Sequence, residues 1–205
     1  MVETLTVLIV GSGGREHAIS NAYEKSPQVK RIIVASGNDF IAFGRKKEVI
    51  VDKNCSVKSP RSIVELAKRY KPDLVDVAQE NPLALGVVNM LQKEGFLAFG
   101  PTGLAARIES DKVWSRKFMR KYGIPHPEFE CFDSEKAGED YARKLYSENP
   151  ERVVYVKASG LATGKGALKS TNLDQAIGNI RRMKEFPDDA GEEFLIEEGL
   201  TGEEF

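Results

Sequence analysis

Short apolar runs that alternate with segments of helical periodicity are the strongest constraint on the fold of this chain. The runs, rich in β-branched residues, are Leu5–Val10, Arg31–Ala35, Leu74–Ala78 and Phe96–Phe99. A run that is apolar throughout must be covered on both faces, which is typical of parallel strands flanked by helices. Between two of the runs, Ile63, Leu66 and Ala67 recur on one helical face. We therefore predict an α/β fold with a doubly wound, Rossmann-like parallel sheet over residues 1–105.

The pattern changes after Gly100-Pro101. A helical stretch, Thr102–Tyr122, is broken near Ser110-Asp111 and stopped by Gly123-Ile124-Pro125, so we take residues 106–122 as a helical connector. Strands are then expected at Glu128–Phe132, Val153–Lys157, Ala167–Ser170 and Phe194–Glu198, with helices at Ser134–Glu148 and Leu173–Lys184 between them. They predict a small α+β unit over residues 123–193, followed by the incomplete start of another subdomain over residues 194–205.

The composition fits a globular protein and excludes several other classes. The 205 residues are 41% hydrophobic and carry a formal net charge of -1. This excludes a disulfide-stapled miniprotein, a collagen-like rod and a disordered chain, and it favours neither nucleic acid nor a membrane as a partner. Cys55 and Cys131 stand far apart, as expected of unpaired cytosolic thiols. Without signal-peptide features or a run long enough to cross a bilayer, we expect a cytoplasmic protein.

The first predicted strand runs directly into a glycine-rich turn, Gly11-Ser12-Gly13-Gly14-Arg15-Glu16-His17. Glycines at a strand-to-helix turn let backbone N–H groups approach an anion, so a phosphate is the expected ligand. A dinucleotide fingerprint would need glycine where Glu16 stands and a carboxylate after the second strand, where the chain has Gly37-Asn38. This disfavours NAD and leaves a sugar phosphate. A turn that serves chain geometry alone stays open.

Two further polar loops follow predicted strands, Gly37-Asn38 and Glu80-Asn81-Pro82. Because the carboxyl ends of parallel strands meet at one edge of a sheet, these loops and the glycine-rich turn could line a single site. Taken singly, each loop fits a solvated connection equally well.

A second glycine-rich segment, Gly160–Gly166, follows Lys157 at the end of a predicted strand. Its Gly164-Lys165 pair is reminiscent of a P-loop, but Gly166 stands where a magnesium-binding hydroxyl is needed and strand-like residues follow, so a P-loop is excluded. A mobile lid over a nucleoside triphosphate stays open, with Lys157 as a point charge for phosphate.

The last predicted strand ends in carboxylates, Glu197 and Glu198, and Glu204 follows. A carboxylate at a strand end can accept a hydrogen bond from an adenine amino group, and a later one can hold ribose hydroxyls. Adjacent glutamates are more often solvated surface, and the same holds for Lys112 on its helix.

In this order, the motifs resemble the phosphoribosylamine–glycine ligase family of the ATP-grasp superfamily over essentially the whole chain. The matching stretches are Val10–Ala18, Gly37-Asn38, Glu80–Leu83, Phe99–Thr102, Glu109–Lys112, Val156-Lys157 with Gly160–Gly166, and Ile196–Glu198 with Gly202–Glu204. The resemblance implies a pre-ATP-grasp domain followed by a truncated ATP-grasp small subdomain. It also implies a reaction of purine biosynthesis: ATP converts glycine to glycyl phosphate, and 5-phosphoribosylamine attacks it to give glycinamide ribonucleotide.

The resemblance also implies roles for individual residues, although it assigns no catalytic residue. The phosphoribosyl substrate would be held by Gly11, Gly13, Gly14, Arg15, Glu16, His17, Gly37, Asn38 and Glu80. ATP would be held by Lys112, Lys157, the lid residues Gly160, Gly164, Lys165 and Gly166, and by Glu197, Glu198, Leu200 and Glu204. Within the last set, the lysines would contact phosphates, Glu197 with the backbone of Glu198 and Leu200 would read adenine, and Glu204 would bind ribose.

ATP and Mg²⁺ are the implied cofactors, and the partners are small-molecule substrates only. Because the resemblance places the magnesium ligands beyond residue 205 and none in this chain, we expect a missing C-terminal half and no turnover by the chain alone. Four residues depart from the family pattern: Ser36 replaces proline, Ala78-Gln79 replaces Gly-Pro, and Ser159 replaces an acidic residue. A non-catalytic binding module and another ATP-grasp amine ligase or carboxylase of purine synthesis remain alternatives.

Overall fold

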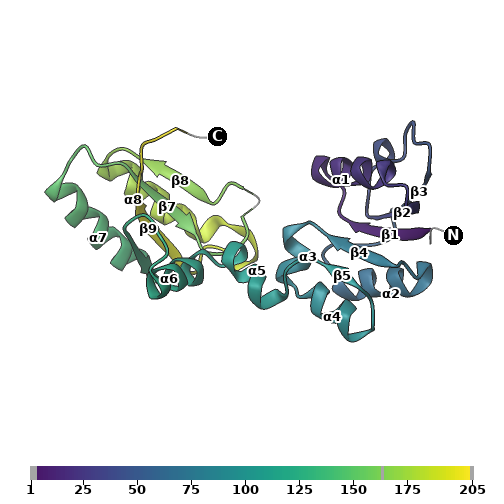
Figure 1. The fold of residues 1–205 in the computed structure, drawn as a ribbon. Coiled ribbons are helices and arrows are strands. Elements are labelled where there is room, and N and C mark those ends of the chain that lie inside the picture. Colours follow the sequence, from purple (N-terminus) through teal and green to yellow (C-terminus); the bar gives the residue numbers. More distant parts are fainter. Residues whose placement is uncertain (1–3, 163, 204–205) are drawn as a thin grey trace. The chain divides into compact units, whose positions relative to one another are not determined.

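The computed structural model describes residues 4–162 and 164–203 (Figure 1). The chain separates into two compact units, Met1–Ala106 and Arg107–Phe205, and each unit has its own sheet and core. Among the described residues, no helix combines the length and the apolar character needed to span a membrane.

A five-stranded parallel sheet forms the centre of the first unit, in the order β3-β2-β1-β4-β5. Its strands are β1 (Leu5–Val10), β2 (Val29–Ala35), β3 (Glu48–Asp52), β4 (Leu74–Val77) and β5 (Ala98–Phe99). The helices are α1 (Gly14–Lys25), α2 (Pro60–Tyr70), α3 (Glu80–Ala84), α4 (Val87–Lys93) and α5 (Gly103–Ser110), the last spanning the boundary between the units. The predicted doubly wound parallel sheet is confirmed.

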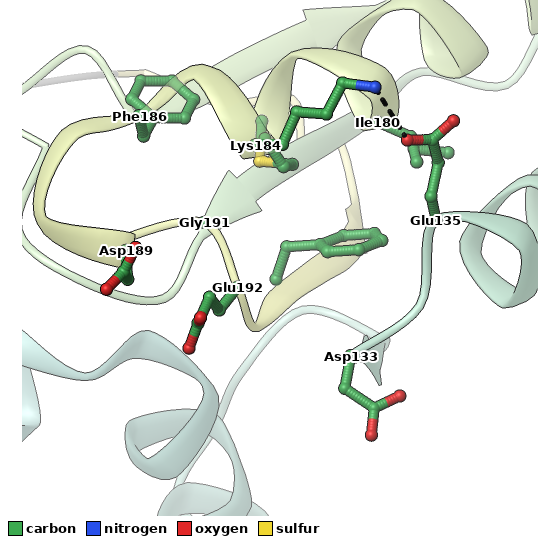
Figure 2. Close-up of a pocket in the computed structure, with 10 residues that line it drawn as sticks. Asp133, Glu135, Ile180, Lys184, Phe186, Asp189, Gly191 and Glu192 are labelled. Carbon is green, nitrogen blue, oxygen red and sulfur yellow. Dashed lines mark ion pairs between the residues drawn. The ribbon is translucent and has the colours of Figure 1, made fainter.

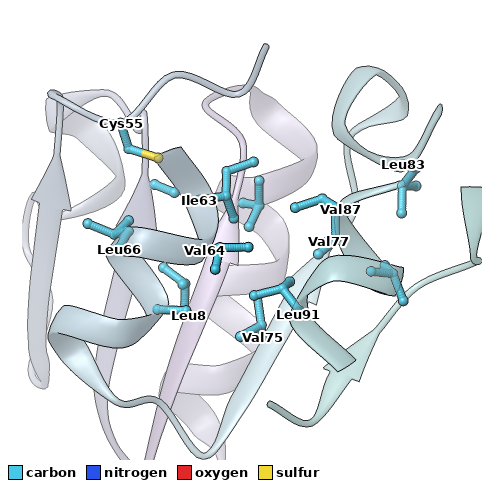
Figure 3. Close-up of a cluster of buried hydrophobic side chains, with 14 of the residues drawn as sticks. Leu8, Cys55, Ile63, Val64, Leu66, Val75, Val77, Leu83, Val87 and Leu91 are labelled. Atoms are coloured by element: carbon cyan, nitrogen blue, oxygen red, sulfur yellow. The ribbon is translucent and has the colours of Figure 1, made fainter. Parts of the chain in front are cut away.

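Helices cover both faces of this sheet. On one face, Leu8 and Val75 of the strands pack with Ile63 of α2 and Leu91 of α4 (Figure 3). On the other, Tyr23 of α1 packs against the opposite side chains of the same strands. Since β2 and β3 lie on one side of β1 while β4 and β5 lie on the other, the chain changes direction between β1 and β4. In such a sheet, ligands bind at the carboxyl edge beside this point.

The edge strand β3 was not predicted. Glu48–Asp52 pairs only with β2, and its apolar residues Val49, Ile50 and Val51 are half-buried. Its run of apolar residues is short and lies between charged residues. Three of the predicted strands of this sheet have shifted limits, since β2 begins at Val29, β4 ends at Val77 and β5 is only Ala98–Phe99.

The second unit contains a four-stranded antiparallel sheet in the order β6-β9-β7-β8. Its strands are β6 (Phe129–Phe132), β7 (Val154–Ala158), β8 (Ala167–Ser170) and β9 (Phe194–Glu198), and its helices are α6 (Lys112–Tyr122), α7 (Glu135–Glu148) and α8 (Leu173–Arg181). The predicted break before α6 is confirmed, because Asp111 is its N-cap, and Gly123 ends the helix with a φ of 65°. The predicted continuation of α8 to Lys184 is a separate 3-10 turn.

The two faces of this antiparallel sheet have different partners. Val156 and Ile196 face α7 and α8 and belong to the larger core of the unit. Leu195, on the opposite face, packs with Val113 of α6. Because side chains alternate along a strand, Lys157 of β7 and Glu197 of β9 also lie on the α6 face.

Candidate functional site

The glycine-rich turn after β1 is shaped by a buried carboxylate. Glu16, in the first turn of α1, is only 4% exposed, and its Oε2 accepts a hydrogen bond from the Gly13 N–H at 2.7 Å. Gly11 has a φ of +137°, and a Cβ at this position would lie 2.5 Å from Cδ of Glu16, so the turn requires glycine here. Glu16 therefore sets the shape of the turn that leads into the N-terminus of α1, where an anion is favoured.

Arg15 and Asn38 join three loops at the carboxyl edge of the parallel sheet. Arg15 Nη1 donates to the Ala78 carbonyl at 2.5 Å, and Nη2 donates to Glu80 Oε1 at 2.6 Å. From the loop after β2, Asn38 Nδ2 donates to the Ser12 carbonyl at 2.6 Å. The predicted convergence of the loops after β1, β2 and β4 is confirmed. The meeting point is the edge where an open parallel sheet takes its ligand.

The charges of this edge suit an anion with hydroxyl groups. The Arg15 guanidinium holds the pKa of Glu80 below its usual range, although partial burial of the carboxylate opposes the shift. The Arg15 side chain is 55% exposed, so its guanidinium is accessible to a phosphate, for which its planar fork is well suited. A carboxylate beside it can accept hydrogen bonds from sugar hydroxyls.

The remaining predicted residues of this edge lie around these contacts. Gly14 begins α1 and is exposed, and His17 is half-buried in the same helical turn. Gly37 fits closely, because a Cβ there would lie 2.7 Å from Cγ1 of Val34. Ser36 adopts a φ of 60°. This left-handed conformation costs a residue with a Cβ about 1 kcal/mol, and such strain concentrates at ligand sites.

A second buried carboxylate of the first unit was not predicted from the sequence. Asp76 of β4 is 6% exposed, and Tyr23 Oη of α1 donates to its Oδ2 at 2.8 Å. Burial raises the pKa of Asp76, the hydrogen bond from Tyr23 opposes this, and the charge of Glu16 adds to the rise. The signal for it was a single acidic residue inside an otherwise apolar strand.

In the second unit, Lys112 is held at the start of the glycine-rich loop. It is the first residue of α6. Its backbone N–H donates to the Ser159 carbonyl at 2.8 Å, and its Nζ donates to the Gly160 carbonyl at 3.1 Å. Ser159 and Gly160 directly follow β7, so the contacts join the N-terminus of α6 to the beginning of the loop.

Lys157, Glu197 and Arg116 form an ion-pair cluster on the α6 face of the sheet. The Glu197 side chain is only 3% exposed. One of its oxygens accepts from Lys157 Nζ, and the other accepts from Arg116 Nε at 2.9 Å. Each carboxylate oxygen has a further lone pair with which it could accept from an adenine amino group. Arg116 was not predicted; the signal for it is its position four residues after Lys112, on the same face of α6.

Positive charge is in excess in this cluster. Burial lowers the pKa of Lys112, and the nearby charge of Lys157 lowers it further. Arg116 and Lys157 both pair with the buried Glu197, so the cluster carries one net positive charge, and Lys112 lies near enough for the charges of both cations to lower its pKa. A partly desolvated site with this balance favours a polyanion such as a nucleotide phosphate chain, which lysines contact as point charges.

Both ends of the glycine-rich loop are fixed by backbone hydrogen bonds. The Gly160 N–H donates to the Ala190 carbonyl at 2.9 Å, and the Gly166 carbonyl accepts from the last residue of β7 at 2.9 Å. Between them, Gly164 and Lys165 are exposed. The loop therefore places an exposed lysine between two anchored ends.

The predicted adenine and ribose contacts lie at the end of β9. The Glu198 N–H donates to the Glu128 carbonyl at 2.9 Å, and its Oε1 accepts from the Glu128 N–H at 3.2 Å, so both groups are engaged beside β6. Leu200 is 68% exposed. Glu204 lies outside the described residues.

A cavity of about 330 Å³ in the second unit lies apart from these residues (Figure 2). It is lined by Asp133, Glu135, Ile180, Met183, Lys184, Phe186, Asp189, Gly191, Glu192 and Phe194. Lys184 and Glu135 pair across it at 3.5 Å. Its apolar wall belongs to the core under α7 and α8, on the sheet face opposite Lys157. The cavity therefore does not form part of the candidate nucleotide site.

Metal ligands are not grouped in the part of the chain that the structure describes. Within residues 4–162 and 164–203, no three His, Cys, Asp or Glu side chains are arranged to hold a metal ion. The oxygen donors that Mg²⁺ requires are thus not assembled there, and we assign no step to the metal.

Comparison with known proteins matches both units to one family. The family model "Phosphoribosylglycinamide synthetase, N domain" matches residues 5–109, and "Phosphoribosylglycinamide synthetase, ATP-grasp (A) domain" matches residues 110–205. A phosphoribosylamine–glycine ligase from Archaeoglobus fulgidus is 35% identical over 97% of this chain and 42% of its own length. The chain thus spans less than half the length of this relative.

Solved structures show the same fold. The phosphoribosylamine–glycine ligase from Thermotoga maritima superimposes with a TM-score of 0.68 at 24% identity, over 97% of this chain and 45% of that one. The N5-carboxyaminoimidazole synthetase from Staphylococcus aureus, complexed with ADP, gives a TM-score of 0.65 at 14% identity, over 98% of this chain and 48% of that one.

The first unit, with its parallel sheet and glycine-rich turn, thus matches an N domain of this kind, and the second, with its antiparallel sheet, matches an ATP-grasp domain. More narrowly, the chain belongs to the phosphoribosylglycinamide synthetase family, as the resemblance predicted.

Proposed function

We propose that the chain is the amino-terminal part of an ATP-dependent ligase that joins glycine to 5-phosphoribosylamine in purine biosynthesis. The observation that carries the proposal is the meeting of three strand-end loops through Arg15 and Asn38, at the carboxyl edge of the sheet in a chain of this family. That edge offers a helix N-terminus, a guanidinium and a carboxylate to a phosphorylated sugar.

The proposed reaction has two steps. The γ-phosphoryl group of ATP moves to a carboxylate oxygen of glycine, which gives glycyl phosphate and ADP. The amine of 5-phosphoribosylamine then attacks the carbonyl carbon, the bond to the phosphate oxygen breaks, and the amine loses a proton to give the amide. An acyl phosphate hydrolyses readily in water, so a loop that closes over it would protect it.

Each unit supplies a different part of the binding machinery. In the first unit, the glycine-rich turn with Asn38 and Glu80 holds the phosphoribosyl group. In the second, Lys112 and Lys157 contact the nucleotide phosphates, and the loop Gly160–Gly166 covers them. Glu197 holds the Lys157 ammonium in place through their ion pair. Its remaining lone pairs accept a hydrogen bond from the adenine amino group. Nucleotide binding is supported by the ADP complex of the Staphylococcus aureus neighbour, which has the same fold.

Binding of ribose 5-phosphate tests the first half of this proposal. We expect Arg15→Ala to weaken binding by about 10- to 100-fold, because a charge-assisted hydrogen bond is lost, while leaving stability within about 1 kcal/mol. Isothermal titration and urea denaturation measure the two effects. Lys68→Ala is the matched control, since it breaks the exposed ion pair with Glu94 at the C-terminal end of α2. Equal affinity in the Arg15 variant and the wild type would contradict the proposed sugar-phosphate site.

Binding of ADP tests the second half. We expect Lys157→Met to weaken ADP binding by at least tenfold and to leave ribose 5-phosphate binding unchanged, because Lys157 belongs to the other unit. Lys136→Met, which removes an exposed lysine on α7, serves as the control. If ADP bound both variants as tightly as the wild type, the lysine cluster would not be the phosphate site.

A further inference from the structure

Asp111 and Ser159 make direct contact where α6 begins and β7 ends. Ser159 Oγ donates to Asp111 Oδ1 at 2.9 Å and accepts from the Val113 N–H at 3.1 Å. Asp111 Oδ1 also accepts from the Trp114 N–H at 3.0 Å, as the N-cap of α6. Ser159 is 7% exposed, so these bonds are largely shielded from water.

The Asp111 carboxylate is held by hydrogen-bond donors on both of its oxygens. Its Oδ1 lies within hydrogen-bond distance of the Ser159 hydroxyl. Arg107 Nη2 donates to the other oxygen of Asp111 at 2.7 Å. Burial would raise the pKa of Asp111, but the bonds from Arg107, Trp114 and Ser159 outweigh it and lower the pKa, so the carboxylate is charged at neutral pH.

This contact is adjacent to two groups of the nucleotide site. Lys112 directly follows Asp111 and is bonded through its backbone N–H to the Ser159 carbonyl. Gly160 directly follows Ser159 and accepts from Lys112 Nζ at 3.1 Å. A shift of either Asp111 or Ser159 would therefore move the Lys112 ammonium and the start of the glycine-rich loop relative to each other.

We propose that Asp111 and Ser159 are a pair of positioning residues that fix the Lys112 ammonium at the start of the glycine-rich loop and so set the affinity for a nucleoside diphosphate. The inference rests on the proposed function of this site. The interaction requires one carboxylate and one hydroxyl in contact. A variant in which the two side chains are exchanged still has both groups.

An exchange experiment on the 205-residue chain tests the pair, with ADP as the probe. Ser159→Asp alone places two carboxylates in contact, and we expect it to weaken ADP binding by at least tenfold. Asp111→Ser alone removes the carboxylate to which Ser159 and Arg107 donate hydrogen bonds, and we expect it to weaken ADP binding about threefold to tenfold. The double variant D111S/S159D restores one carboxylate and one hydroxyl, so its affinity should return to within threefold of the wild type.

A Lys112→Met background separates positioning from general damage to the fold. If the pair acts through Lys112, Ser159→Asp should change ADP affinity by less than threefold once the ammonium is absent. Ser134→Ala, which removes the N-cap of α7, is the control for loss of a cap elsewhere. Thermal unfolding of each variant reports the structural effect separately.

The outcomes distinguish this inference from the proposed function. Failure of the wild type to bind ADP would overturn both. Binding by the wild type without recovery in the double variant, or an equal loss from Ser159→Asp in the Lys112→Met background, would overturn the positioning pair and leave the nucleotide site standing.

Discussion

A single buried carboxylate gives the first unit a pH-dependent stability. Because the pKa of Asp76 is raised above its unfolded value, the native state holds the proton more tightly than the unfolded chain does. The stabilising contribution is therefore complete below the unfolded pKa, about 4, and is lost as the pH rises through the folded pKa. At neutral pH the buried charge destabilises the native state.

Asp76→Asn should remove this dependence. The amide oxygen still accepts from Tyr23 Oη, and the buried charge is gone. We expect the free energy of unfolding at pH 7 to rise by about 1 kcal/mol, and the difference from the wild type to shrink toward pH 4. Urea denaturation between pH 4 and pH 7 measures this difference in the free energy of unfolding. Tyr23→Phe, which keeps the charge and deletes its donor, should lower stability at pH 7; a less stable Asn variant at pH 7 would contradict the argument.

At the scale of residues, the sequence predicted side chains that carry a distinctive pattern. Arg15 and Glu80 follow strand ends within recognisable motifs, and they meet in the structure. Arg116 lies among Lys117, Arg120 and Lys121, and such a helix looks like a solvated surface until the burial of Glu197 is known. Ion pairs between distant segments depend on tertiary packing, so local patterns do not reveal them.

Among the structural elements, the strands buried on both faces were predictable and the edge strand was not. β1 is fully buried from Val7 to Val10, and its apolar run is evident in the sequence. β3 has a partner on one side only, and Val49, Ile50 and Val51 stay half-buried. A three-residue apolar run between charged residues resembles a loop as much as a strand, because edge strands need less apolar cover.

The turn between β1 and α1 should be intolerant of a side chain at one glycine and tolerant at another. Gly11→Ala combines a φ of +137° with a Cβ 2.5 Å from the buried Glu16 side chain, so we expect a loss of about 2 kcal/mol or more. Gly14→Ala begins α1, where a Cβ meets nothing within 4 Å, and should be neutral or slightly stabilising. Urea denaturation compares the stability of the two variants. An equal loss in both would show that Glu16 does not fix the turn.

For the whole molecule, the fold class followed from the sequence because each unit repeats one pattern over many residues. Apolar strands alternating with helices gave the parallel sheet, and the change after Gly100-Pro101 marked a different unit. The order of strands and the pairing of β9 between β6 and β7 were not predictable, since they depend on contacts between segments far apart in the chain.

Each unit carries its own spectroscopic or chemical reporter, so ligand effects on the two units can be measured separately. Trp114, the one tryptophan of the sequence, belongs to α6 and stacks on Phe118 with ring centroids 5.1 Å apart. Cys55 is buried in the core of the first unit, where its thiol is protected from reagents until that unit opens. Tryptophan fluorescence thus reports the second unit, and thiol labelling of Cys55 reports the first.

Because each unit has its own core, a ligand should stabilise the unit that binds it. At about 100 times its Kd, ribose 5-phosphate should add about 2.7 kcal/mol to the first unit, which slows Cys55 labelling about 100-fold and leaves the Trp114 unfolding transition in place. ADP should stabilise the second unit, which shifts the Trp114 unfolding transition and leaves the rate of Cys55 labelling unchanged. Peptide mapping separates the label on Cys55 from that on Cys131. If either ligand shifted both reporters equally, the two binding sites would not be confined to separate units, and the assignment of sugar phosphate to one unit and nucleotide to the other would be wrong.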